Sequence, residues 1–328
     1  MAKPITSAHP VSSPGQGFGN GGAPLQNVIW SVGGGKGGIG KSFISSSLAI
    51  CLTRIGKTVT LVDLDLGAAN LHTCLGIKAP QESLSDYLSG RVPNLAKISS
   101  YTEIQGLSFI GGHNDALNIA DLAHSSKQNL ISELRSLPTD YVVLDLGAGT
   151  NETTLDFFLA ADQKIAAVAP EPTSIENAYR FLKSSYYRKL RQAENELGLQ
   201  NLIEEAMDLR NKHGIRSPAD LLHYINQVDP IAGARLAEKI SDFKVQLLLN
   251  QVRTREDIEL GYSMRSVCRK YFGIDATYLG YLDHDNAVWQ SLRKRRPLLV
   301  EYPYSSIVGQ FLGITKNLIN PHALRAVV

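Results

Sequence analysis

The chain has 328 residues, of which 43% are hydrophobic and 20% are charged, as in an ordinary globular protein. Its 33 Lys and Arg residues nearly balance its 31 Asp and Glu residues, so it lacks the general basic excess that is typical of nucleic-acid-binding proteins. The three cysteines, Cys51, Cys74 and Cys268, have no C-x-x-C spacing. This argues against a disulfide scaffold, a cysteine-held zinc site and an iron–sulfur cluster, and favours a reducing cytoplasm.

The first 25 residues are predicted to form a disordered tail. Residues 1–24 contain five Gly, four Pro and three Ser, and they lack the apolar core of a signal peptide. No uninterrupted apolar run of about 18 residues follows, so the sequence predicts no membrane span. We therefore expect one folded domain over residues 26–328.

Short β-branched segments alternate with longer helical patterns along this domain, which is typical of a parallel sheet covered by helices. The predicted strands are residues 28–32, 58–63, 107–110, 141–145, 164–169, 245–250 and 277–282. Apolar runs such as Val142-Val143-Leu144 and Leu247-Leu248-Leu249 do not alternate with polar residues, as expected for strands that are buried on both faces. The sequence predicts a doubly wound α/β fold with a mostly parallel sheet of seven to eight strands and helices on both faces. Ligands bind such sheets at the carboxyl ends of the strands.

Residues 186–244 interrupt this alternation and contain no predicted strand. Proline follows a capping residue at Ser217-Pro218 and at Asp229-Pro230, as in the first turn of a helix. Apolar residues recur at helical spacing in three stripes, namely Leu202, Ala206 and Leu209, then Leu221, Tyr224, Ile225 and Val228, then Leu236, Ile240 and Phe243. We predict a helical insertion that covers the sheet; docking of a partner is the alternative.

A glycine-rich segment connects the first predicted strand to the first predicted helix. Residues 33–42 read G-G-G-K-G-G-I-G-K-S and match the phosphate-binding pattern G-x-x-x-x-G-K-[ST]. Such glycines let main-chain N–H groups surround a phosphate, to which the following helix presents its positive end. We expect Lys41 to contact the β- and γ-phosphates and Ser42 to bind Mg²⁺; a flexible loop without a ligand is the alternative. The other predicted nucleotide-binding residues here are Gly35, Lys36, Gly37, Gly38, Ile39, Gly40 and Phe43.

Acidic residues end two further predicted strands. Asp63 and Asp65 follow one strand, and Asp145 follows another before a glycine-containing turn that reaches Gly149. We expect Asp63 and Asp145 on the metal side of the phosphate loop, with some contacts through water because Mg²⁺ keeps several waters. Acids that simply end a strand and cap a turn are the alternative. The main-chain N–H of Gly149 is placed to sense the γ-phosphate.

The second lysine of the loop, Lys36, gives the pattern K-G-G-x-G-K-S, which resembles the deviant Walker A motif of the MinD/ParA group of dimeric ATPases, in the SIMIBI class of P-loop NTPases. The resemblance implies that Lys36 reaches across a homodimer interface to the partner's ATP and that Lys36 and Lys41 act in catalysis. The string D-x-D-x-G-x-x-N resembles the group's first switch segment. This implies that Asp65 orients the attacking water and that Asn70 supports the site.

Two further features bear on the nucleotide base. Asn250, after the strand over residues 245–250, resembles the group's adenine-contacting residue, and Arg253 follows it closely. No N-K-x-D guanine signature is present, which favours ATP. Many relatives carry a proline in the last strand-end turn, whereas this chain reads Leu282-Asp283-His284-Asp285.

Residues 170–174 read P-E-P-T-S. Thr173 and Glu176 have the spacing of a capping box at a helix start. The same string resembles MinD and the flagellar-number regulators of the FlhG/FleN type, which implies that Glu171 lies near the dimer interface. The chain departs from those regulators because its N-terminal tail lacks their glutamine-containing activating helix and because its helical insertion is atypical.

Two segments near the end of the chain bear on partners. The dense basic run Arg293-Lys294-Arg295-Arg296 is interpreted as a solvated last helical turn stopped by Pro297; contact with DNA or anionic lipid is the alternative. A C-terminal amphipathic helix is predicted over residues 304–319. We expect its apolar stripe, Ile307, Phe311, Ile314 and Leu318, to pack on the core, although relatives end in a membrane-targeting helix.

Together these patterns predict a cytoplasmic, Mg²⁺-dependent ATPase that forms a homodimer on binding ATP and is reset by slow hydrolysis. The resemblance implies control of the position or number of a flagellum, pole or division site, a protein partner that stimulates hydrolysis, and peripheral contact with the inner face of the cell membrane. ParA-like, ATP-dependent DNA binding is the alternative. Iron–sulfur carriage has little support because the cysteines are widely separated.

Overall fold

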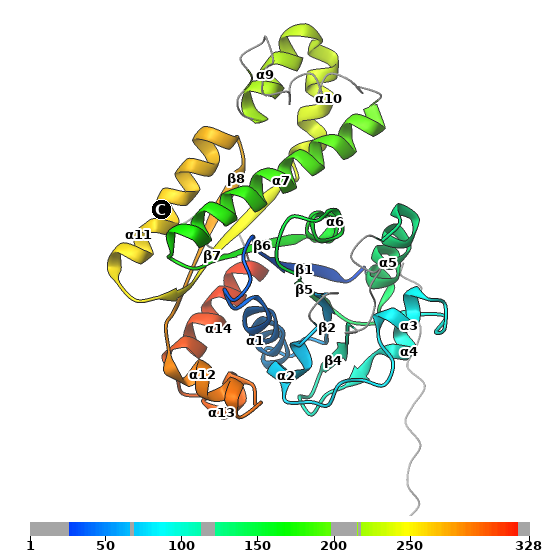
Figure 1. Cartoon of the computed structure of the whole chain (residues 1–328), viewed down its shortest axis with the longest axis vertical. Helices are drawn as coiled ribbons and strands as arrows, with labels where there is room; N and C mark the ends of the chain where they lie inside the picture. The colour runs from blue at the N-terminus through cyan, green and yellow to red at the C-terminus, as the bar shows by residue number, and fades with distance from the viewer. Residues whose placement is uncertain (1–25, 66–68, 113–121, 198–214, 216–217, 321–328) are drawn as a thin grey trace, which may run out of the picture.

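An eight-stranded sheet forms the centre of the protein (Figure 1). The computed structural model describes residues 26–65, 69–112, 122–197, 215 and 218–320. The strands are β1 (Val28–Gly33), β2 (Val59–Leu64), β3 (Ser100–Tyr101), β4 (Leu107–Ile110), β5 (Tyr141–Leu146), β6 (Gln163–Val168), β7 (Lys244–Val252) and β8 (Asp275–Asp283). Their order across the sheet is β3-β4-β2-β5-β1-β6-β7-β8, and among these strands β3 alone pairs antiparallel. The predicted doubly wound, mostly parallel fold is confirmed.

All seven predicted strands are present, with ends that shift by at most two residues. The unpredicted strand, β3, has two residues and therefore carries no readable periodicity. The apolar runs of β5 and β7 are buried on both faces, as expected: Val142, Val143 and the three leucines of residues 247–249 are inaccessible to solvent.

Helices cover both faces of the sheet and bury two separate hydrophobic clusters (Figure 1). One face carries α1 (Lys41–Arg54), α2 (Leu71–Leu75), α13 (Leu298–Glu301) and α14 (Ser306–Ile319). The other face carries α3 (Leu84–Leu88), α4 (Leu95–Ile98), α5 (His124–Ser136), α6 (Glu152–Ala160), α7 (Pro172–Leu197) and α11 (Arg255–Val267), which continues into the π-helix η1 (Cys268–Phe272). The helix α12 (Asn286–Arg293) precedes α13 at the lower end of Figure 1.

The predicted C-terminal helix packs on the core. Ile307 and Phe311 of α14 are fully buried, and the Phe311 ring meets Phe43 of α1 edge-on with 5.4 Å between ring centroids. The apolar stripe of α14 is therefore used inside the protein, as expected. Residues 321–328 lie outside the described residues.

The long helix α7 extends beyond the sheet to two short helices, α9 (Pro218–Val228) and α10 (Pro230–Ile240) (Figure 1). As predicted, Asp229 caps α10, accepting from the main-chain N–H groups of Ile231 and Ala232 at 3.0 Å. The predicted start of the insertion at Tyr186 falls inside the continuous helix α7. Most residues of the second and third apolar stripes are at least partly buried, but Val228 is exposed. The first stripe lies outside the described residues, and the division of the chain stays a prediction.

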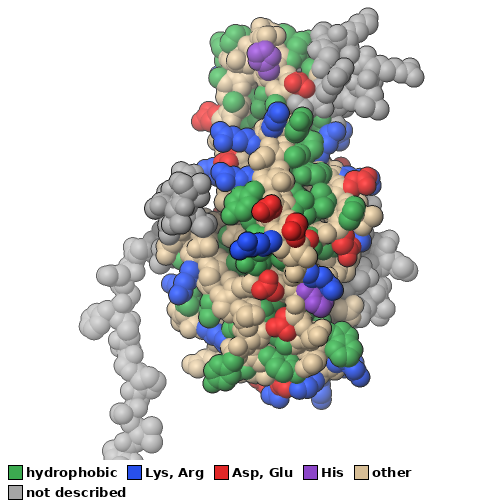
Figure 2. Space-filling model, turned by 90° about the vertical axis from the view of Figure 1, so that its left-hand side faces the viewer, with side chains coloured by type: hydrophobic (Ala, Val, Ile, Leu, Met, Phe, Trp, Pro, Cys, Tyr) green, Lys and Arg blue, Asp and Glu red, His purple; other side chains and the backbone are tan. Residues whose placement is uncertain are grey.

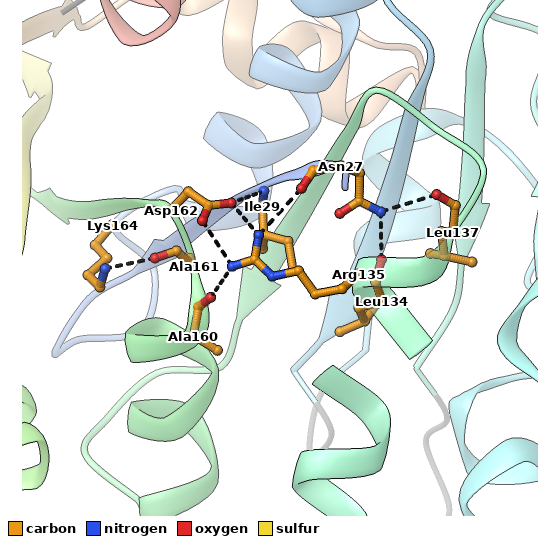
Figure 3. Close-up of polar contacts among 9 residues, drawn as sticks. All are labelled: Asn27, Ile29, Leu134, Arg135, Leu137, Ala160, Ala161, Asp162 and Lys164. Carbon is orange, nitrogen blue, oxygen red and sulfur yellow. Dashed lines mark hydrogen bonds and ion pairs between the residues drawn. The ribbon is translucent and has the colours of Figure 1, made fainter. Parts of the chain in front are cut away.

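A polar network ties the amino ends of the central strands to the helices (Figure 3). The Arg135 guanidinium of α5 donates to both Asp162 carboxylate oxygens, at 2.5 and 2.9 Å. Asp162 also accepts from the main-chain N–H of Ile29 at 2.7 Å, and the buried Lys164 ammonium donates to the Ala161 carbonyl at 2.7 Å. These contacts hold the amino ends of β1 and β6, which lie at the opposite end of the strands from the phosphate-loop motif.

Candidate nucleotide-binding site

The glycine-rich loop lies at the carboxyl edge of the sheet, between β1 and α1. β1 is flanked by β5 and β6, and the register pairs Val32 with Asp145. On the next strand, Asp63 of β2 pairs with the same Asp145. The topology therefore brings the two predicted metal-side acids together beside the loop, although they are 82 residues apart in sequence.

Two glycines of the loop are required by close packing. A Cβ atom at Gly35 would collide with the main-chain carbonyl of Asn177 in α7. Gly40 has φ 90°, and a Cβ atom there would meet the Asn250 amide nitrogen at 2.4 Å. The loop is thus held closely between α7 and the end of β7, while Gly37 and Gly38 have open space around them.

Lys41 begins α1 and directs its ammonium group back over the loop. Its side-chain nitrogen donates to the Lys36 carbonyl at 3.3 Å, and the residue is only 7% exposed. Burial lowers the pKa of Lys41, and the neighbouring charges of Asp145 and Asp65 oppose that effect. A buried ammonium group between loop carbonyls and carboxylates is well placed to bind phosphate oxygens.

Asp145 and Ser42 provide a donor set that fits Mg²⁺. Asp145 is almost fully buried, and among the described residues its Oδ1 atom has no hydrogen-bond partner. Burial raises the pKa of Asp145 to about 6, although the Ser42 and Ser45 hydroxyls oppose this by hydrogen bonding. A buried carboxylate oxygen without a hydrogen-bond partner, next to a hydroxyl, can bind a cation. Mg²⁺ is commonly held by one or two carboxylates together with phosphate oxygens.

Asp63 uses both carboxylate oxygens in hydrogen bonds within the turn that follows β2. Its two carboxylate oxygens accept from the main-chain N–H groups of Asp65 at 3.1 Å and Leu71 at 3.0 Å. Burial, then the Asp145 charge, raises the pKa of Asp63 to about 8. The side chain therefore shapes the segment that leads into α2 as well as facing Asp145.

The predicted first switch segment also meets the glycine-containing turn after Asp145 here. The Asp65 carboxylate lies 3.2 Å from the position that a Cβ atom on Gly147 would take. The Gly149 N–H, predicted to sense a γ-phosphate, donates to the Gly34 carbonyl at 3.3 Å. Asn70 is exposed and occupies the N-cap position of α2, and residues 66–68 lie outside the described residues.

Lys36 lies at the mouth of the site in contact with the start of α7. Its ammonium group is 3.0 Å from a Glu171 carboxylate oxygen and 3.1 Å from the Thr173 hydroxyl. The predicted capping role of Thr173 is wrong, because α7 already begins at Pro172 and Glu176 pairs with Arg180 instead. The sequence predicted Glu171 near a dimer interface, which stays a prediction; its contact with Lys36 and that of Thr173 were not predicted.

The two residues predicted to contact the base, Asn250 and Arg253, have different surroundings. The Asn250 amide nitrogen donates to the Ile39 carbonyl at 2.8 Å, so this buried side chain holds the phosphate loop. Gln251 then has φ 64°, and Arg253 lines an open pocket of about 820 Å³ with Asp283, His284 and other residues. Phe43 packs on Phe311 in the core.

Two site residues were not predicted from the sequence. Asn177 contacts Gly35 through its main chain, which leaves no signal in its identity. Ser45 lies one helical turn after Ser42, donates its hydroxyl to the Lys41 and Ser42 carbonyls at 3.0 and 3.2 Å, and opposes the rise in the pKa of Asp145; its i, i+3 spacing was the available signal. Within the described residues, no three His, Cys, Asp or Glu side chains are grouped to share a metal ion, and no helix is long and apolar enough to cross a membrane.

We predict that the free energy of unfolding, without nucleotide, falls as pH rises from about 4 to about 8. The folded protein keeps protons on Asp63 up to about pH 8 and on Asp145 up to about pH 6, whereas an unfolded chain releases them near the ordinary value of 3.8. The stability gained from these protons is therefore present at low pH and lost through this window. Mg²⁺ with nucleotide needs the ionised carboxylates, so its stabilising effect should grow as pH rises.

Thermal unfolding across this pH range, with and without Mg-ADP, measures both effects. Asp63→Asn provides the control, because it removes one of the two titrating groups and should leave only the smaller fall in stability due to Asp145, which ends near pH 6. The prediction would be contradicted if, without nucleotide, the unfolding temperature of the wild-type protein rose between about pH 4 and pH 8 relative to that of Asp63→Asn.

The fold and the loop geometry define a P-loop nucleotide-binding protein of the NTPase class. The family described as "ParA: NUBPL iron-transfer P-loop NTPase" matches residues 25–189. The antiactivator FleN of Pseudomonas aeruginosa is 31% identical over 309 residues, covering 90% of this chain and 86% of FleN. The chain therefore belongs to the ParA/MinD family of P-loop NTPases, which confirms the resemblance seen in its motifs.

Two further relatives extend this comparison. The flagellum site-determining protein YlxH of Helicobacter pylori is 32% identical over 158 residues, covering 45% of this chain and 50% of YlxH. The septum site-determining protein MinD of Pyrococcus horikoshii, solved as a complex with Mg-ADP, has a TM-score of 0.61 at 18% identity. That match covers 92% of this chain and all of the MinD chain, and it shows the same fold.

Proposed function

We propose that this protein is a Mg²⁺-dependent ATPase that dimerises on binding ATP and controls the number or placement of flagella or of another polar structure. The observation that carries this proposal is the second loop lysine, Lys36, which sits half-exposed at the mouth of the loop, held by Glu171. A lysine in that position is free to exchange its acidic partner for a phosphate across an interface. The name of YlxH, a flagellum site-determining protein, supports a flagellar output.

Hydrolysis in such a site requires an oriented water and neutralisation of charge on the transferred phosphoryl group. Lys41, Lys36 and Mg²⁺ supply the positive charge, and Asp65 orients the water. Ser42 and Asp145 would hold the ion, and Asp63, whose oxygens already accept from main-chain N–H groups, would contact it through water. Gly149 exchanges its bond to Gly34 for the γ-phosphate, and Asn70 supports this arrangement.

The adenine base occupies the neighbourhood of Asn250 and Arg253 in this proposal. Asn250 acts chiefly by holding Ile39 and thereby the loop, whereas Arg253 lines the adjoining pocket. Hydrolysis is slow until a protein partner stimulates it. ATP-dependent DNA binding is less favoured, because the relatives covering most of the chain include FleN and because positive and negative residues nearly balance.

The decisive experiment measures solution mass by light scattering with Mg-ADP and with Mg-ATP. The wild-type protein should be a monomer with ADP and a dimer with ATP, and Lys36→Ala should remain a monomer with ATP. Lys189→Ala is a matched control, because Lys189 forms a comparable ion pair with Asp242, at 2.9 Å, far from the loop. A wild-type monomer in both nucleotide states would refute the dimer mechanism.

A further inference from the structure

A buried cluster of charged side chains joins three helices on one face of the sheet. Asp156 of α6 accepts from the Lys127 ammonium of α5 and from the Arg188 guanidinium of α7, the latter at 2.8 and 3.0 Å. The Gln192 amide of α7 donates to the same carboxylate at 2.9 Å. The side chains of Lys127 and Asp156 are only 5% and 7% exposed. Each Asp156 oxygen accepts two hydrogen bonds, so this buried carboxylate is fully satisfied.

Arg188 also reaches the first residue of α6. Its guanidinium lies 3.2 Å from a carboxylate oxygen of Glu152, the residue at which α6 begins. Glu152 and Asp156 are four residues apart and therefore share one side of that helix. The planar guanidinium presents several N–H donors in a fixed arrangement, which suits it to hold two acceptors at once. One arginine of α7 thus holds the first turn of α6 through two carboxylates.

The first turn of α6 directly follows the glycine-containing turn at the nucleotide site. Because β5 ends at Leu146, only the five residues 147–151 connect that strand to α6. Asn151 caps α6, and Gly149 lies two residues before it. The Gly149 N–H points towards the phosphate loop, where it donates to the Gly34 carbonyl at 3.3 Å. The place of this N–H therefore depends on where the first turn of α6 is held.

The helix that carries Arg188 also contacts the phosphate loop. The main-chain carbonyl of Asn177 in α7 lies directly against Gly35. Asn177 and Arg188 are 11 residues apart, which is about 16 Å along one continuous helix. Beyond Arg188, α7 continues to α9 and α10, which form the narrow upper end of the molecule (Figure 2). A single rigid element therefore sets the distance between the phosphate loop and the first turn of α6.

Packing between α6 and α7 does not depend on the charged cluster. The buried rings of Phe158 and Phe181 meet edge-on, with 4.8 Å between their centroids. Desolvation largely offsets the attraction within a buried ion pair, so the cluster adds little net stability. We propose that Arg188 is a positioning residue, which holds the first turn of α6 so that the Gly149 N–H meets the γ-phosphate of ATP. This inference rests on the part of the proposed function that places the γ-phosphate at Gly149.

The test is titration calorimetry with Mg-ADP and with the non-hydrolysable ATP analogue Mg-AMP-PNP. The full chain carries Lys36→Ala throughout, so that dimerisation does not add to the measured affinity. Adding Arg188→Gln should weaken the binding of AMP-PNP about tenfold, as expected for the loss of one hydrogen bond to a charged group, and should leave ADP binding unchanged. Asp156 keeps its contact with Lys127 in this variant, so the protein should fold. Glu152→Ala, which removes a carboxylate that is 62% exposed, should give a smaller loss and should add nothing to Arg188→Gln.

Arg135 provides the matched control. It holds both Asp162 oxygens at the amino ends of the strands, and its side chain is 21% exposed, compared with 19% for Arg188. Arg135→Gln should lower the unfolding temperature and leave the ratio of the two nucleotide affinities unchanged.

Two results would overturn the positioning role of Arg188. One is an unchanged ratio of ADP to AMP-PNP affinity in Arg188→Gln, even with a lower unfolding temperature. The other is an equal loss of affinity for both nucleotides, which would indicate general damage to the site. A selective loss of AMP-PNP binding by Arg188→Gln, in a protein whose wild type neither dimerises nor hydrolyses ATP, would refute the proposed function and leave the positioning role in place.

Discussion

Replacing Lys41 with alanine should weaken the binding of Mg-ATP by about tenfold to a hundredfold for each hydrogen bond to phosphate that is lost. Hydrogen bonds to charged groups contribute about 1.5–3 kcal/mol each, and Lys41 is placed to make at least one. Its ammonium group already spans the loop to the Lys36 carbonyl. The substitution leaves the loop glycines and α1 intact, so the loss should appear in affinity rather than in folding. Titration calorimetry with Mg-ATP measures it.

Lys164 offers a matched control for this prediction. It is as buried as Lys41, burial likewise lowers its pKa, and its ammonium group donates to the Ala161 carbonyl at the opposite edge of the sheet (Figure 3). Lys164→Ala should therefore lower the unfolding temperature and retain nucleotide binding. If Lys41→Ala bound Mg-ATP with wild-type affinity, the assignment of the loop lysine would be wrong.

Most of the fold could be predicted from local sequence patterns. Strand positions were readable because buried parallel strands need uninterrupted apolar runs, as in Val142-Val143-Leu144. The phosphate loop was readable because its glycines and lysine are close in sequence. The start of the insertion, placed at Tyr186, stays a prediction; that residue lies inside α7, which keeps one helical period through it, and only tertiary packing shows where the sheet ends beneath the helix.

Contacts between distant residues could not be read from the sequence. Asn250 and Ile39 are 211 residues apart, and nothing in either residue indicates that the amide would hold the loop carbonyl. The pairing of Lys36 with Glu171 spans 135 residues and depends on the place of α7 beside β1. The motif identified the loop, but the side chains that support it came from helix and strand ends that meet only in the fold.

Replacing Asp65 with alanine should slow ATP hydrolysis by about 10²–10⁴-fold, the range expected when a group that positions or deprotonates the attacking water is lost. The surroundings of Asp65 support this proposed role rather than one in holding the loop. Its main-chain N–H is fixed by Asp63, its carboxylate faces Gly147, and its charge acts on both Lys41 and Asp145. None of the loop contacts described above uses its carboxylate.

Since binding should survive this change, the Asp65→Ala protein should accumulate as the ATP-bound dimer. Single-turnover phosphate release gives the rate, and light scattering on the same samples gives the mass. Asp140→Ala serves as the control, because Asp140 holds Thr58 at the opposite end of β2, with hydrogen bonds of 2.8 and 2.9 Å, and should leave hydrolysis unchanged. Wild-type hydrolysis by Asp65→Ala would remove its role with the water. Loss of ATP binding instead would assign Asp65 to the nucleotide, because the main-chain bond to Asp63 is retained in this variant.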